Sequence, residues 1–234
     1  MAGTDSVLGL RRIWQSLLVQ VVSQALLVAG LLAGDAVASA TGSYDMGYNT
    51  AIVVTAVALV AQMVAWVEIV AILGRPKDRG PAFVSASRWY LVSFCLVFAY
   101  FVCHSTAGVL QLDGAAGVAL SLAESIVVSL RDIASLVALW KLIEGCTQYL
   151  DSLGEPSARL RSFHRVRTSL AVIVIVQLML ALPATMLSIL APDSLAYGVV
   201  SLIEAFVNLL GFIAQVIATL RVRATWKIVE GMLG

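Results

Sequence analysis

The sequence predicts an all-α integral membrane protein, a bundle of six transmembrane helices with both termini in the cytoplasm. Hydrophobic residues make up 60% of the 234 residues and charged residues only 12%, whereas a soluble domain is about half apolar and about a quarter charged. The chain also contains six apolar runs of the length needed to cross a bilayer, which takes about 20 residues. Because these runs occupy most of the chain, we expect a single transmembrane domain over residues 1–234.

The predicted spans are separated by short segments that contain polar and turn-forming residues. The spans cover about residues 13–34, 50–73, 89–110, 115–139, 168–190 and 195–220. Glycine and proline in residues 74–81 predict a loop after the second span. We expect tight turns at residues 111–114 and 191–193, an outer loop over residues 35–49 and the longest inner loop over residues 151–167.

The positions of the basic residues predict the orientation. Fourteen of the fifteen Lys and Arg lie in the ends and loops that would share one side of the membrane, and the three opposite loops contain none. Lys and Arg are enriched on the cytoplasmic side of membrane proteins, so both termini are predicted to be cytoplasmic. We expect the plasma (inner) membrane of a prokaryote, although the endoplasmic reticulum would satisfy the same rule.

The chain also shows signs of an internal repeat. A shift of eighty residues aligns the fourth span with the sixth without a gap, so that Glu124 meets Glu204 and Lys141 meets Arg221. The second span shares the last part of this pattern, because residues 60–65 match residues 213–218. Charge is rare inside a span, so the aligned acidic pair favours a repeat of the last two helical hairpins, and the match with the second span would extend it to three repeated helical hairpins. Repeats in membrane proteins often place a site at their interface.

The aligned glutamates are the first candidates for a functional site. Glu124 lies about ten residues into its span, which is roughly 15 Å from the start and near mid-bilayer, and Glu204 lies at the same depth. Ionisable groups at this depth are costly and usually face the bundle interior or a wet cavity. In one interpretation the two carboxylates flank a site for a cation, a proton or a polar ligand. In the other they only fix helix packing.

Two further charges follow Glu124 in the same span. Arg131 lies seven residues later on the same helix face, and Asp132 lies near that face. Arg131 would bind an anionic ligand, pair with Glu204 across the bundle, or pair with an acid and extend its side chain towards the cytoplasmic interface.

Polar residues in other spans complete the predicted site. Gln20 and Gln24 belong to a polar stripe in the first span, whose three- and four-residue spacing places it on one helix face. Lipid solvates amides poorly, so this stripe should face the bundle. Asn208 lies four residues after Glu204 on the same face, and Gln177 lies in the middle of the fifth span. The predicted ligand- or proton-binding set is Gln20, Gln24, Glu124, Arg131, Asp132, Glu204 and Asn208.

These features favour a small-solute or ion transporter, or the membrane substrate-binding component of one. The alternative is a non-catalytic subunit or scaffold of a larger membrane complex. In that case the buried polar groups would only specify helix packing, and the small-residue stripe of Ala25, Ala29 and Ala33 would dock a partner. The expected partners are the lipid bilayer, a small polar solute or ion, and a membrane protein partner or a second copy of the chain.

Other function classes are disfavoured by what the sequence lacks. It contains no HExxH, GxSxG, P-loop or GxGxxG motif in its expected context, so we expect no enzyme activity. The three cysteines have no metal-ligand spacing, and the two histidines are too far apart to hold a haem, so no metal or other cofactor is expected. The basic residues are spread along one membrane face, which disfavours nucleic-acid binding.

Overall fold

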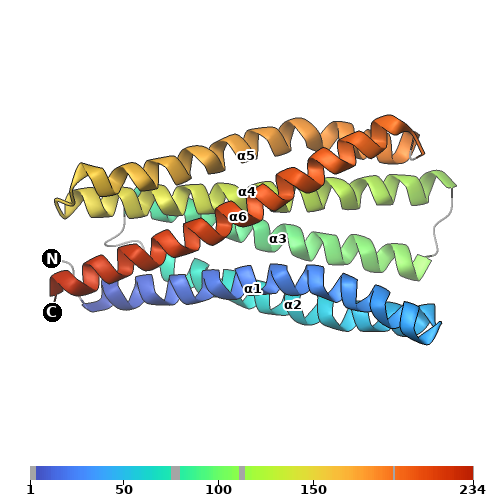
Figure 1. Cartoon of the computed structure of the whole chain (residues 1–234), viewed down its shortest axis with the longest axis horizontal. Coiled ribbons are helices and arrows are strands. Elements are labelled where there is room, and N and C mark those ends of the chain that lie inside the picture. Colours follow the sequence, from blue (N-terminus) through green and yellow to red (C-terminus); the bar gives the residue numbers. More distant parts are fainter. Residues whose placement is uncertain (1–3, 75–79, 111–113, 192, 234) are drawn as a thin grey trace. The chain divides into compact units, whose positions relative to one another are not determined.

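The chain is helical almost throughout the part that the computed structural model describes, residues 4–74, 80–110, 114–191 and 193–233. These residues form six helices and no strand (Figure 1). The helices are α1 (Thr4–Thr41), α2 (Tyr44–Leu73), α3 (Pro81–Leu110), α4 (Gly114–Ser152), α5 (Ser157–Leu190) and α6 (Leu195–Leu233). The prediction of an all-α fold is confirmed.

Five of these helices contain a segment that is long and apolar enough to cross a membrane. The segments are Leu8–Thr41, Tyr44–Leu73, Pro81–Cys103, Leu160–Leu187 and Leu195–Met232. Among the described residues α4 has no such segment, since Glu124, Arg131 and Asp132 interrupt its apolar run. The length and composition of these five helices therefore agree with the predicted contact with a lipid bilayer.

The helices form two compact units, which we describe separately. The first unit comprises Met1–Ile72 and Val222–Gly234, and therefore contains α1, nearly all of α2 and the C-terminal part of α6. The second unit comprises Leu73–Arg221, with α3, α4, α5 and the remainder of α6.

In the first unit, α1 and α2 form an antiparallel hairpin with a very short connection. The expected outer loop over residues 35–49 is wrong, because α1 continues to Thr41 and α2 begins at Tyr44. The hydroxyls of Ser39 and Thr41 donate to the carbonyls four residues earlier, at 2.8 and 2.7 Å, so these polar residues are accommodated inside the helix. Gly42 then adopts a φ of 66°, which is the left-handed conformation that ends a helix, and the backbone turns at once.

Glycines allow the two helices of this hairpin to approach closely. A Cβ added at Gly34 would lie 2.8 Å from both the Ala51 side chain and the Gly47 carbonyl oxygen, and one at Gly47 would lie 2.5 Å from the Gly34 carbonyl oxygen. Close backbone contact through small residues is a common basis of helix pairing in membranes.

We expect Gly47→Ala to destabilise this hairpin by about 1–3 kcal/mol, the usual cost of overfilling a packed site. Gly198→Ala is the matched control in another long helix, because a Cβ at Gly198 meets no atom within 4 Å. The control should leave stability unchanged or raise it by about 0.5–1 kcal/mol, the usual gain when alanine replaces glycine in a helix. Thermal unfolding of both purified variants measures the difference, and equal midpoints would show that the contact does not hold the hairpin.

In the second unit, α4 packs against both α3 and α5 (Figure 1). A Cβ added at Gly145 of α4 would lie 2.9 Å from the Phe83 ring of α3, so glycine again permits a close contact. The expected loop over residues 151–167 is largely wrong, because α5 begins at Ser157. Gly154, with a φ of 78°, provides the turn between α4 and α5.

The first turns of α5 are amphipathic, although the residues up to 167 are predicted as a loop. Leu160, Phe163, Val166 and Leu170 recur every three or four residues and are all buried, while Arg161 and Arg165 between them are exposed. The apolar face packs and the basic face projects outward. The basic residues alone suggested a loop, and only their spacing relative to the apolar residues indicates a helix.

Candidate functional site

The predicted site residues of α4 and α6 all belong to the second unit. Glu124, Arg131 and Asp132 lie on α4, and Glu204 and Asn208 lie on α6. Glu124 and Glu204 are each partly buried. Glu124 lies two turns before Arg131, and Glu204 lies one turn before Asn208, so each helix contributes a short polar face within an otherwise apolar sequence.

Arg131 and Asp132 form an ion pair although they are neighbours in the sequence. The Arg131 Nε donates to the Asp132 Oδ1 at 2.8 Å, and the Nη2 of the same guanidinium lies 2.7 Å from that oxygen. The Arg131 side chain is 18% exposed and that of Asp132 41%. The long arginine side chain therefore bends back to its neighbour, and the pair as a whole is neutral.

Glu204 of α6 belongs to the same compact unit as this pair. The Asp132 carboxylate of α4 acts electrostatically on the Glu204 carboxyl of α6. The interaction is repulsive when both are ionised, because both groups are acidic. Arg131 thus pairs with Asp132 on its own helix, Asp132 acts on Glu204 of α6, and the role of these three residues in binding a ligand stays a prediction.

An amide pair joins α5 to α6 one turn away from Glu204. The Gln177 Nε2 donates to the Asn208 Oδ1 at 3.0 Å. The Gln177 Oε1 is buried and accepts no hydrogen bond from the part of the chain that the structure describes. The sequence marks Gln177 as a polar residue in the middle of the fifth span, outside the predicted site. Its signal was an amide inside an apolar run, the same signal that selected Gln20.

Gln20 and Gln24 belong to α1 in the first unit, so their place in the site remains a prediction. Gln20 is fully buried, as are Ser16 and Ser23, which lie four residues before it and three residues after it on the same helix face, so this part of the polar stripe faces protein. Ser16 donates to the Glu68 carboxylate of α2 at 2.6 Å. Neither the oxygen nor the nitrogen of the Gln20 amide has a hydrogen-bond partner among the described residues.

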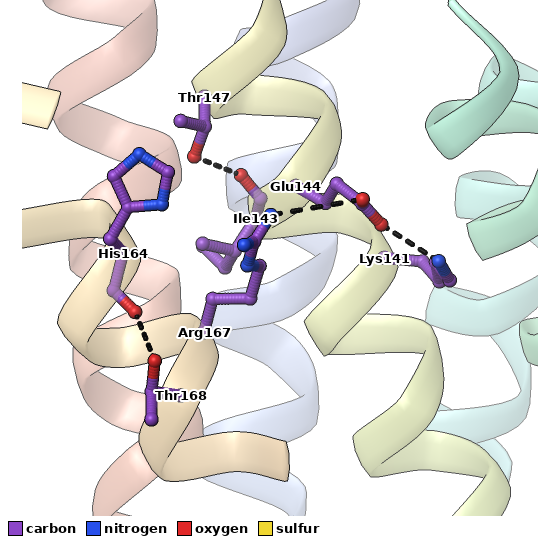
Figure 2. A network of polar contacts seen from close by, with 7 residues as sticks. All are labelled: Lys141, Ile143, Glu144, Thr147, His164, Arg167 and Thr168. Atoms are coloured by element: carbon purple, nitrogen blue, oxygen red, sulfur yellow. Dashed lines mark hydrogen bonds and ion pairs between the residues drawn. The ribbon is translucent and has the colours of Figure 1, made fainter.

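A second polar network lies at the end of α4 nearest the turn to α5. Glu144 of α4 pairs with Lys141 at 2.8 Å and with Arg167 of α5 at 3.7 Å (Figure 2). Thr147 and Thr168 donate to backbone carbonyls within their own helices, so their hydroxyls are already occupied. This network connects two neighbouring helices, and nothing in it points to a ligand.

Searches against protein families, curated proteins and solved structures found no match to this chain. Within the described residues, no group of three or more His, Cys, Asp or Glu side chains is arranged to hold a metal ion. The fold and the polar cluster therefore define a general class: a helical protein with apolar helices of membrane-spanning length and an interhelical polar cluster.

Proposed function

We propose that this chain is a small-solute or ion transporter, or the membrane substrate-binding component of one. The observation that carries the proposal is the position of Glu204, an acidic residue within the apolar segment of α6 and in the same compact unit as the Arg131–Asp132 ion pair of α4. Glu204 lies nine residues after Leu195, which is about 14 Å along the helix at about 1.5 Å per residue. That is near the middle of about 30 Å of hydrocarbon, where an acidic group is costly and usually functional.

The charges of the cluster favour a cation or a proton as the ligand. Arg131 and Asp132 neutralise each other through their ion pair, so ionised Glu204 adds a negative charge that this pair does not compensate. A cation or a proton at Glu204 would relieve the repulsion from Asp132. The Asn208 and Gln177 amides, one turn away, would supply further oxygen atoms.

We further propose that α4 crosses the membrane in addition to the five helices named above. The chain would then have six spans, arranged as three repeated hairpins. Its length of 39 residues is sufficient, it packs against α3 and α5, and the Arg131 side chain is only 18% exposed. Six spans would place both termini on one side, which the basic residues predict to be the cytoplasm of a prokaryotic inner membrane. Reporter fusions should then show both termini inside, and termini on opposite sides would contradict a sixth span.

The proposed activity is tested by ion flux into proteoliposomes. We would load vesicles with a pH-sensitive dye to follow protons and measure the uptake of radioactive sodium and rubidium in parallel. At least one of the three fluxes should exceed that of protein-free vesicles. If none does, and a second polypeptide copurifies at fixed stoichiometry, the chain is a subunit or scaffold instead.

A further inference from the structure

The first unit contains a cluster of aromatic and basic side chains where the N-terminal part of α1 meets the C-terminal part of α6. The Trp14 and Trp226 rings stack with their centroids 5.5 Å apart and their planes 22° apart. The Arg223 guanidinium lies 5.3 Å from the Trp14 ring, and the Arg11 guanidinium 5.7 Å from the Trp226 ring. Lys227 lies 4.4 Å from the Trp226 ring. We call these five residues the tryptophan–arginine cluster.

The two arginines of this cluster retain their capacity to bind an anion. Within the described residues neither Arg11 nor Arg223 pairs with a carboxylate, whereas Lys227 pairs with Glu230 at 2.8 Å. Both arginines are exposed. A guanidinium that lies over an aromatic ring has its face covered and its N–H edge open, and this edge fits two oxygens of a phosphate group. The cluster therefore presents two such edges, one from each helix.

The position of the cluster along the helices fits a membrane–water interface. Helix α1 has 38 residues, which is about 57 Å at about 1.5 Å per residue and exceeds the hydrocarbon thickness of about 30 Å. Trp14 lies ten residues after the first residue of α1, and Trp226 lies seven residues before the end of α6. Tryptophan is enriched at the interface, where its ring sits at the level of the lipid headgroups.

Exposed apolar residues continue from the cluster along the same face of α1. Leu18 and Val22 follow Arg11 by seven and eleven residues, which are helical repeats, and both are exposed. A basic group at the interface with an apolar stripe beside it matches a phospholipid, whose phosphate would meet Arg11 while an acyl chain lies along Leu18 and Val22. A soluble phosphate compound has no acyl chain that would contact this stripe.

We propose that the tryptophan–arginine cluster binds the phosphate of an anionic phospholipid in the leaflet on the side of the chain termini. Arg11 and Arg223 hold the phosphate oxygens, and the stacked Trp14 and Trp226 rings fix the positions of both guanidinium groups. The basic residues predict this side to be cytoplasmic, and the cytoplasmic leaflet is the one rich in anionic lipid. This site is separate from the proposed transport activity, which does not depend on it.

The experiment compares lipid binding by the full chain and by two double variants of equal charge. Native mass spectrometry in a titration with phosphatidylglycerol or phosphatidylcholine gives the affinity for each lipid. Arg11→Gln/Arg223→Gln should bind phosphatidylglycerol on the order of 20-fold more weakly, because each basic residue near an anionic surface contributes about a factor of five. The control Arg161→Gln/Arg165→Gln removes two exposed arginines of α5 and should retain the wild-type affinity. Equal loss in both variants would overturn the proposal.

Two further measurements separate this site from simpler explanations. Arg11→Lys/Arg223→Lys keeps the charge but removes the planar guanidinium, so it should also weaken binding, and it carries the test if the glutamine variant does not fold. Unchanged binding in the lysine variant would show that the lipid responds only to positive charge and not to the guanidinium groups, and it would overturn the proposal. Inorganic phosphate at millimolar concentration should not displace the lipid, and displacement would assign the site to a soluble anion instead.

Discussion

Glu204→Gln is expected to abolish the cation or proton flux of the reconstituted protein while leaving the protein folded. Glutamine keeps the size and hydrogen-bonding capacity of a protonated glutamate but cannot ionise, so it can neither release a proton nor attract a cation. The substitution also removes the repulsion between Asp132 and an ionised Glu204, so stability should be unchanged or higher. The expected change in flux is at least about tenfold, which corresponds to about 1.4 kcal/mol of lost ligand interaction.

The matched control for this prediction is Glu230→Gln on the same helix. Glu230 is half-exposed at the C-terminal end of α6 and pairs only with Lys227 in the described structure, and exposed pairs contribute about 0–1 kcal/mol. This control should transport at the wild-type rate. Normal flux in Glu204→Gln would remove Glu204 from the proposed mechanism. If the wild-type protein shows no flux and Glu204→Gln fails to fold, the scaffold alternative is favoured.

The apolar runs in the sequence predict the helices well but not their ends. Segments of high hydropathy locate the part of a helix that would lie in hydrocarbon, whereas backbone hydrogen bonding continues beyond it. Helix α1, for example, begins at Thr4 and ends at Thr41, although only residues 13–34 were predicted as a span. For the same reason Gly47 was assigned to a loop, and its close contact with Gly34 could not be expected.

The sequence selects candidate site residues because charge inside an apolar run is conspicuous in any sequence. Arg131, Asp132 and Glu204 are selected in this way; the structure pairs Arg131 with Asp132, and Asp132 acts on Glu204. The sequence left the acidic partner of Arg131 open, because a long side chain can reach a neighbour on its own helix or an acid on another. The pairing of Gln177 with Asn208 depends on the rotation of α5 against α6, which no property of a single helix determines.

Arg131→Leu is expected to be the most destabilising substitution in the polar cluster. Removing one partner of an ion pair leaves the other charge uncompensated, and because the Asp132 side chain is 41% exposed, water offsets part of the loss and the cost should be about 1–2 kcal/mol. The like charge of Glu204, on which Asp132 acts, adds to this cost. We expect a lower thermal midpoint and less folded protein after extraction.

The double variant Arg131→Leu/Asp132→Leu provides the decisive comparison. Replacing both partners of a buried ion pair with apolar residues is often neutral or stabilising, so the double variant should recover most of the stability that Arg131→Leu loses. Lys141→Leu serves as a control, because it breaks a peripheral pair with Glu144 that Arg167 still contacts, and its cost should stay below about 1 kcal/mol. If the double variant were no more stable than Arg131→Leu, the guanidinium would have to act through a partner other than Asp132. The charge balance that favours a cation or a proton at Glu204 would then be wrong.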